Sequence, residues 1–151
     1  MELFFQNYLD RLQRQHSEME SAIAGFSQDG LDWSPGEGMN SICVLAVHVA
    51  GAERYWMGDV VAGEPSGRDR EAEFHVHGLD KTALVARLKD SLSYCQMVLE
   101  KLSLEDLAKP RIRNERQVTV GWVLAHVLAH TAEHTGQMQI MRQLWEHRGQ
   151  G

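Results

Sequence analysis

Three histidines recur at four-residue spacing in the C-terminal part of the sequence: His126, His130 and His134. On an α-helix, residues four apart lie one above the other, with Cβ atoms about 5–6 Å apart. Two imidazoles at this spacing can bind one metal ion, as paired histidines do on the helices of some zinc proteases. We therefore take metal binding as the first hypothesis for the chemistry of this chain.

The segment that carries these histidines has the pattern of a long helix. Thr119 is a good N-cap residue, apolar residues follow it at helical spacing, and no proline occurs before Gly149. We predict a helix from Thr119 to Arg148 and expect the rest of the chain to act as a scaffold around it.

A metal usually needs three or more protein ligands, and His130 with His134 supplies two. The best candidate for a third is His48, which lies in the middle of another predicted helix. Three neutral imidazoles would leave a divalent ion with open positions for water or a thiol, whose pKa the ion lowers.

The remaining histidines have less suitable surroundings. His16 has polar and charged neighbours, and we expect it to be solvated. His147 falls in a polar C-terminal turn, where a histidine suits the helix dipole. His75 and His77 follow Phe74 in a long connection, which either folds over a site or forms a surface crossover.

Three further helices complete the predicted fold. The first covers residues 2–24 and ends at Gly25, the second begins at Asn40 or Ser41 and ends at Gly63, and the third begins at Asp80. A loop containing Trp33 should close one end of the core. The basic segment 111–118 should be a short extended stretch, and we see no convincing strand pairs.

These patterns predict an all-α protein, an antiparallel four-helix bundle with a long connection, residues 63–79, between its second and third helices. The length of 151 residues predicts a single domain, 1–151. The net charge of −6 argues against broad nucleic-acid binding, and no apolar run approaches the roughly 18 residues of a membrane span. Cys43 and Cys95 lie in apolar helical patterns, so we expect buried thiols, which fit a reducing cytoplasm. The first 15 residues place acidic and polar residues among the apolar ones, so we expect no signal peptide.

The order of motifs resembles a known family. Residues 33–42, Trp-Ser-Pro-Gly-Glu-Gly-Met-Asn-Ser-Ile, precede the helix with His48, and residues 119–137 read Thr-Val-Gly-Trp-Val-Leu-Ala-His-Val-Leu-Ala-His-Thr-Ala-Glu-His-Thr-Gly-Gln. This layout resembles the DinB-like superfamily of small four-helix-bundle proteins, also called DinB/YfiT-like, over nearly the whole chain. The resemblance implies a divalent metal bound by His48, His130 and His134, because the family pattern His-x-x-x-His-x-Gly-Gln fixes the register at Gln137.

The resemblance also implies a cofactor and a function. Nickel or zinc is the expected metal, with iron or manganese as further options, although imidazole ligands by themselves suit zinc, nickel, copper and iron. Relatives of this kind include S-transferases and isomerases that use a low-molecular-weight thiol. The first hypothesis is therefore a metal-dependent enzyme that activates such a thiol, or a water for hydrolysis, to act on a small-molecule substrate. The alternative is a non-catalytic metal-binding or stress-linked interaction bundle; the family is commonly homodimeric.

Two residues are candidates for a catalytic role. Gln137 lies three residues after His134, so its amide could orient a ligand histidine or a bound water. His126 would lie one turn before the ligand pair, near the bundle mouth or a partner subunit, where it lines the pocket or donates to a core carbonyl.

The charged neighbours of these residues have weaker assignments. We expect Glu133 on the surface and Glu53 paired with Arg54 or with a neighbouring helix. Three arginines, which precede the fourth helix, either receive the carboxylates of an anionic substrate or thiol or form a solvated basic loop; they are Arg111, Arg113 and Arg116.

Overall fold

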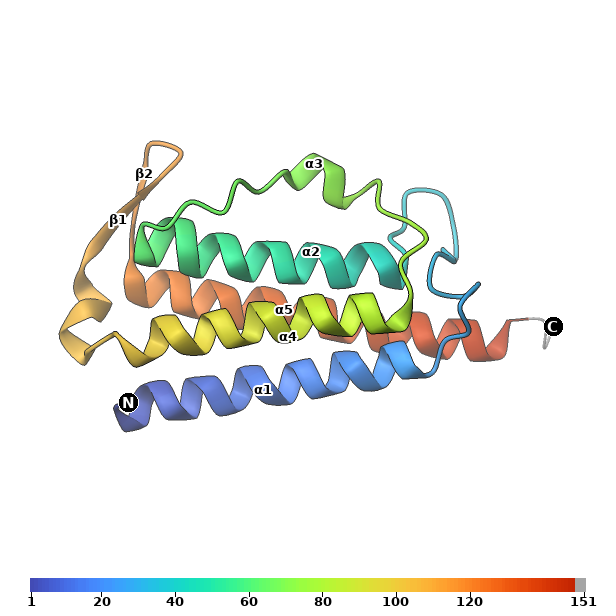
Figure 1. Ribbon diagram of the computed structural model, residues 1–151, viewed down its shortest axis with the longest axis horizontal. Coiled ribbons are helices and arrows are strands. Elements are labelled where there is room, and N and C mark those ends of the chain that lie inside the picture. Colours follow the sequence, from blue (N-terminus) through green and yellow to red (C-terminus); the bar gives the residue numbers. More distant parts are fainter. Residues whose placement is uncertain (149–151) are drawn as a thin grey trace.

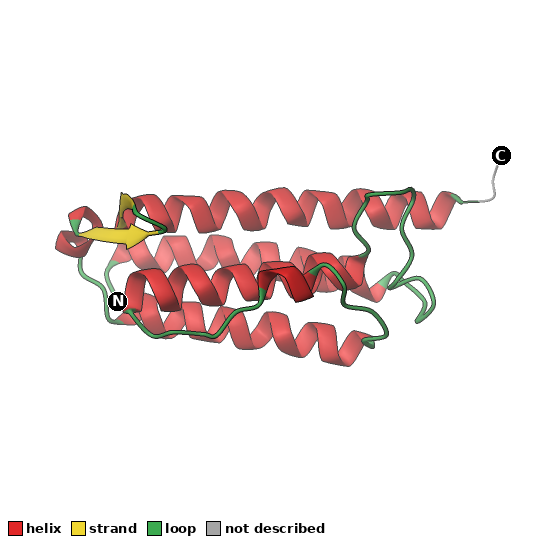
Figure 2. Cartoon of the chain, turned by 90° about the horizontal axis from the view of Figure 1, so that it is seen from above, coloured by secondary structure: helices red, strands yellow, loops and turns green. Residues whose placement is uncertain are grey.

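Four long helices dominate the computed structural model, which describes residues 1–148 (Figure 1, Figure 2). They are α1 (Leu3–Ala24), α2 (Ile42–Arg54), α4 (Lys81–Glu100) and α5 (Val120–His147). α2 continues directly into a π-helical segment, Tyr55–Ala62. The connection between α2 and α4 contains one short helix, α3 (Arg70–Glu73). Among the described residues, no helix has the length and apolar character needed to cross a bilayer.

Side-chain caps fix where the helices begin. The Ser41 hydroxyl accepts from the backbone N–H of Val44, and the Asp80 carboxylate accepts from that of Ala83. Thr119 caps α5 in the same way, at 3.1 Å from the N–H of Trp122. Such caps each contribute about 1 kcal/mol by satisfying an N–H that has no helical partner. All three predicted helix starts are confirmed.

The predicted all-α bundle is confirmed, and the long connection determines its directions. α1 packs against α4 and α5, and α2 packs against the same two helices. The connection carries the chain back along the length of α2, so that α4 runs in the same direction as α2 (Figure 1). Antiparallel packing therefore holds for the pairs α1/α4 and α2/α5, whereas α1/α5 and α2/α4 run parallel.

A β-hairpin precedes α5, where a single extended stretch was predicted. β1 (Pro110–Arg113) pairs antiparallel with β2 (Arg116–Thr119). Asn114 and Glu115 form the two-residue turn with φ of 45° and 66°, the geometry that matches the twist of a hairpin. The expectation of no strand pairs was wrong here because glutamate is not a typical residue for positive φ, so the sequence carries only half of the turn signal.

The interior confirms the predicted roles of the cysteines and of the first loop. Cys43 and Cys95 are free thiols with no exposed surface, and burial raises the pKa of both above the ordinary value. Trp33 is half-buried, and its ring lies 5.5 Å from that of Trp145 at one end of the bundle. Neither thiol is therefore suited to ligate a metal or to act as a nucleophile.

Candidate metal centre

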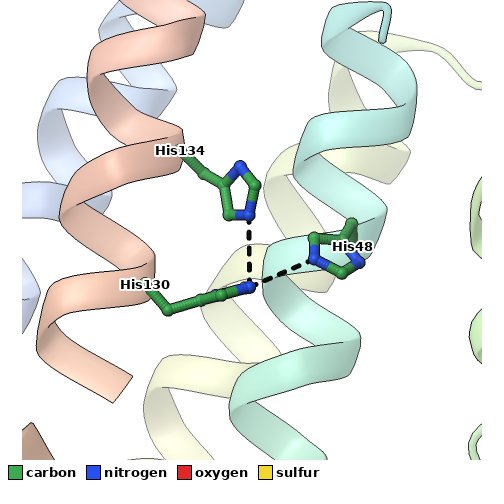
Figure 3. A group of neighbouring side chains, drawn as sticks. All are labelled: His48, His130 and His134. Atoms are coloured by element: carbon green, nitrogen blue, oxygen red, sulfur yellow. Dashed lines mark hydrogen bonds between the residues drawn. The ribbon is translucent and has the colours of Figure 1, made fainter. Parts of the chain in front are cut away.

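The side chains of His48, His130 and His134 meet between α2 and α5 (Figure 3). The Nε2 atom of His130 lies 3.2 Å from Nε2 of His48 and 3.2 Å from Nε2 of His134. One nitrogen from each ring lies within 4.8 Å of the other two. Within residues 1–148, these histidines are the one set of three or more His, Cys, Asp or Glu side chains whose possible ligand atoms lie this close together. The structure therefore brings together the three residues that the sequence singled out.

These separations fit a metal ion. Zinc–imidazole bonds of about 2.0–2.1 Å in a tetrahedral arrangement place two ligand nitrogens about 3.3 Å apart. The two 3.2 Å distances match this value. A single proton on His130 Nε2 could be donated fully to only one of its two neighbours, whereas a cation would use the lone pairs of all three rings. The donor set thus suits a divalent ion of borderline softness.

The Nδ1 atoms of two of these histidines face acceptors, which leaves their Nε2 lone pairs directed at the centre. His48 Nδ1 lies 2.9 Å from Oε2 of Glu73, and His134 Nδ1 lies 2.7 Å from Oε1 of Gln137. A ring that donates its Nδ1–H to a carboxylate is fixed in orientation and becomes a more basic ligand at Nε2. Gln137 therefore lies against His134, one of the three histidines of the group.

Glu73 comes from the short helix α3 of the long connection, and Arg68 from the same connection holds it. The guanidinium donates to both carboxylate oxygens, Nε to Oε1 at 2.6 Å and Nη2 to Oε2 at 2.8 Å. Burial by itself would raise the pKa of Glu73, but the hydrogen bonds and charges of Arg68 and His48 outweigh it and keep the pKa below the ordinary value. Glu73 is thus an anion that bridges a metal-ligand candidate and an arginine.

Gly51 makes room for this anion on α2. A Cβ atom at this position would overlap Oε1 of Glu73 and would come within 3.4 Å of Arg68 Nε. Glycine in a helix interior is destabilising by roughly 0.5–1 kcal/mol relative to alanine. Its presence one turn after His48 is explained by the close approach of the connection to α2.

The electrostatics of the centre favour the neutral form of His130 and His134. Burial, and then the charges of His134 and His48, lower the pKa of His130 to about 3. Burial is also the main cause that lowers the pKa of His134. Neutral imidazole is the form that binds metal, so these rings remain competent ligands below neutral pH.

His126 lies one turn before the ligand pair, and the structure places it beside the group. Its ring is 5.7 Å from that of His130, packs edge-on against Trp56 at 4.5 Å and stacks on Trp122 at 5.1 Å with 5° between the planes. Burial, followed by the charge of Arg113, lowers the pKa of His126. His126 is therefore a neutral imidazole in an aromatic cluster.

The histidines of the long connection lie outside the group. His75 and His77 are both exposed, and His75 Nε2 lies 3.3 Å from a carboxylate oxygen of Glu71. Phe74 does approach the centre, with its ring 5.0 Å from that of His48. Glu133 is exposed, as predicted, and the exposed His147 lies in the last turn of α5.

The prediction that His16 is solvated was wrong. His16 is 1% exposed, and its Nε2 lies 2.9 Å and 3.0 Å from the two carboxylate oxygens of Glu53 on α2. Ser91 of α4 and Thr131 of α5 donate their hydroxyls to the same carboxylate, each at 2.8 Å. The expectation that Glu53 pairs with a neighbouring helix is confirmed, and each of the four long helices contributes one residue to this buried polar cluster.

Sequence reasoning missed the supporting residues rather than the histidines of the centre. A signal for His16 was present, because Leu12, His16, Met19 and Ile23 follow the 4-3-4 spacing of a buried helical face. Gly51 in the interior of a predicted helix was a second signal of close approach. Glu73 and Arg68 carry no local signal, since only the path of the connection brings them to His48.

A cavity of about 680 Å³ lies under the connection, and Glu73 and Arg68 form part of its wall together with Gly51 and Tyr94. None of the three histidines lines it. A molecule in this cavity would contact the carboxylate that supports His48 rather than an ion at the Nε2 atoms.

Comparison with known proteins identifies relatives of this fold. The sequence profile of the DinB superfamily matches residues 11–138. A conserved protein from Enterococcus faecalis superposes with a TM-score of 0.82 at 18% identity, covering 95% of this chain and 97% of that one. No curated protein matches the sequence.

Two further solved structures are DinB-like proteins. The one from Bacillus cereus has a TM-score of 0.76 at 13% identity, with 93% of this chain and 92% of that chain covered. The one from Bacillus subtilis has a TM-score of 0.73 at 17% identity, with 95% and 94% covered. At these identities the structural likeness concerns the fold.

Proposed function

The chain belongs to the DinB superfamily, and from this premise we propose that it binds a divalent metal ion through His48, His130 and His134. The observation that carries the proposal is the convergence of three Nε2 atoms at separations suited to one ion. Nickel and zinc fit a site of three neutral imidazoles, and the hydrogen bonds to Glu73 and Gln137 support the ligands as they do in known metal sites.

We further propose that the protein is an enzyme acting on a small molecule. A divalent ion with three protein ligands keeps open positions, where it lowers the pKa of a low-molecular-weight thiol or of water and so supplies a nucleophile for S-transfer or hydrolysis. Gln137 already accepts from His134, so its role is to orient a ligand rather than to contact substrate. His126, neutral and one turn away, is the candidate to accept a proton from the incoming nucleophile.

A second candidate is a bundle that binds metal without catalysis. The burial of His48 and Glu73, 6% exposed each, favours it because this side of the centre is closed by protein. The two functions differ in whether the ion keeps an open position that a thiol or a water with its substrate can reach. The expected homodimer and cytoplasmic location remain predictions.

Metal content is the first test. Tag-free protein and the variants His48→Ala, His130→Ala, His134→Ala and His126→Ala are analysed by inductively coupled plasma mass spectrometry, with helicity followed by circular dichroism. We expect about one ion per chain in the wild type, loss of the ion in the first three variants, and retention in His126→Ala. Absence of metal from the wild type, even after incubation with zinc and nickel, would refute the proposal.

A further inference from the structure

The three arginines around the hairpin have different environments. Arg111 is bound to the backbone, with Nε donating to the carbonyl of Val61 at 3.1 Å and Nη1 to that of Pro110. The guanidinium of Arg116, an exposed residue, lies 5.2 Å from the centre of the Trp122 ring. Arg113 is half-buried, and among residues 1–148 no carboxylate forms an ion pair with it. Its buried Nε also has no hydrogen-bond partner.

Aromatic rings hold the guanidinium of Arg113 in place. It lies 4.5 Å from the centre of the Trp56 ring and 5.9 Å from that of Tyr55. Stacking on a ring face fixes the plane of a guanidinium but leaves its edge N–H groups free to donate. Arg113 is therefore an oriented cation with uncommitted donors, unlike a solvated arginine of a basic loop.

A continuous row of rings joins this cation to the candidate metal centre. The rings of His130 and His126 are 5.7 Å apart, those of His126 and Trp56 are 4.5 Å apart, and Arg113 follows at 4.5 Å from Trp56. Trp122, which is 38% exposed, stacks on His126 along the same row. The three steps add up to at most about 15 Å, so a molecule that spans them must be an extended chain and not a compact one.

We propose that Arg113 binds an anionic group of the substrate whose other end reacts at the three-histidine centre, and that the ring of Trp122 contacts its apolar body. The substrate class is thus a molecule with an anion at one end, an apolar middle and its reacting atom at the other end. A planar guanidinium recognises carboxylate through paired charge-assisted hydrogen bonds. This inference rests on the proposed function, because it places the reacting end at the metal.

The test compares matched thiols on the cobalt(II)-loaded protein, whose visible absorption reports ligands of the ion. Mercaptohexanoate and mercaptohexanol have the same length and differ in the charge at the far end. We expect the wild type to bind the carboxylate about tenfold more tightly, and Arg113→Gln to lose this preference while still binding mercaptohexanol. Arg116→Gln, a change of the same kind on the same hairpin, should keep the preference. Metal content is verified in each variant.

The outcomes separate this inference from the proposed function. If both thiols bind the wild type equally, Arg113 has no such role, and thiol activation stands. If neither thiol changes the spectrum, thiol activation fails. Adipate and hexanoate then replace the thiols: each can bind the ion through one carboxylate, and only adipate has a second carboxylate at its far end for Arg113. A preference for adipate that disappears in Arg113→Gln supports the inference, and no preference for adipate overturns it.

Discussion

Two histidine–carboxylate pairs of nearly equal length occur in this bundle, and they differ in what surrounds them. His48 Nδ1 and Glu73 Oε2 are 2.9 Å apart, as are His16 Nε2 and Glu53 Oε1. In the first pair the second ring nitrogen points at two other imidazoles. In the second pair the second nitrogen, Nδ1 of His16, is buried without a hydrogen-bond partner.

This difference shows that a histidine–carboxylate pair does not by itself determine whether the histidine supports the core or is available to bind a metal. Glu53 also accepts hydrogen bonds from the hydroxyls of Ser91 on α4 and Thr131 on α5. The partners of this carboxylate are therefore buried side chains of the core. Glu73 forms an ion pair with Arg68 at the edge of the bundle. It binds only Nδ1 of His48, so the lone pair of His48 Nε2 stays free and has a fixed direction. The same two functional groups therefore join four helices in one place and support a candidate ligand in the other.

The largest effect is expected from breaking the core pair. Glu53→Ala would leave His16, Ser91 and Thr131 buried without their common acceptor, and each buried donor left without an acceptor costs about 1–3 kcal/mol. We expect a loss of this size in the free energy of unfolding from urea titration, and a clearly smaller loss for Glu73→Ala. Equal losses would show that the two pairs do not differ as proposed.

A second variant separates the net contribution of this cluster to the free energy of unfolding from the cost of leaving its members unpaired. The combined variant His16→Leu, Glu53→Met, Ser91→Ala and Thr131→Val removes every polar side chain of this cluster. Replacing all partners of a buried polar cluster by apolar residues of similar shape is often neutral or stabilising, so much of the stability lost in Glu53→Ala should return.

The next effect concerns the pair at the candidate centre. Glu73→Gln keeps an oxygen near His48 but removes the charge that makes its imidazole a stronger ligand. Loss of such a supporting group typically lowers metal affinity about 10–100-fold, which a competition titration with a chromophoric zinc chelator would measure. Glu100→Gln, an exposed change of the same kind on α4, serves as a control and should leave the affinity unchanged. An unchanged affinity in Glu73→Gln would remove the proposed role of the carboxylate.

The smallest effect, counted per pH unit, is the pH dependence of the stability of the metal-free protein. The pKa of His130 is about 3 in the folded state, and an unfolded histidine has a pKa of about 6.5. Between these values the unfolded chain binds a proton that the folded chain does not, so stability is present above pH 6.5 and decreases as the pH falls. The slope from one group stays below about 1.4 kcal/mol per pH unit. Urea titrations in chelator at several pH values should show a steeper decrease for the wild type than for His130→Asn.

Local signals in the sequence predicted most of the fold. The caps at Ser41, Asp80 and Thr119 and the break at Gly25 act within a few residues of themselves, so they can be identified without a structure. The hairpin turn was missed because Glu115 adopts a backbone conformation that its type rarely favours.

The sequence predicted the histidines of the candidate centre but not the residues that support His48. The spacing of His130 and His134 follows from helix geometry, and the position of His48 in the middle of another predicted helix made it the third candidate. The resemblance to DinB-like proteins supplied the register. The positions of Glu73 and Arg68 depend on how the connection between α2 and α4 folds back, which no periodicity encodes. The inward direction of His16 was encoded in the 4-3-4 spacing, but its polar neighbours in sequence hid it.

The distance along the chain between His48 and His130 is 82 residues. An ion held by both would act as a removable cross-link that closes this long loop, and the entropy lost on closing a loop grows with the logarithm of its length. During synthesis, His48 leaves the ribosome long before α5 exists, so the ion can be captured with all three ligands only when the chain is nearly complete. Metal loading would then mark finished molecules and leave truncated ones unfilled.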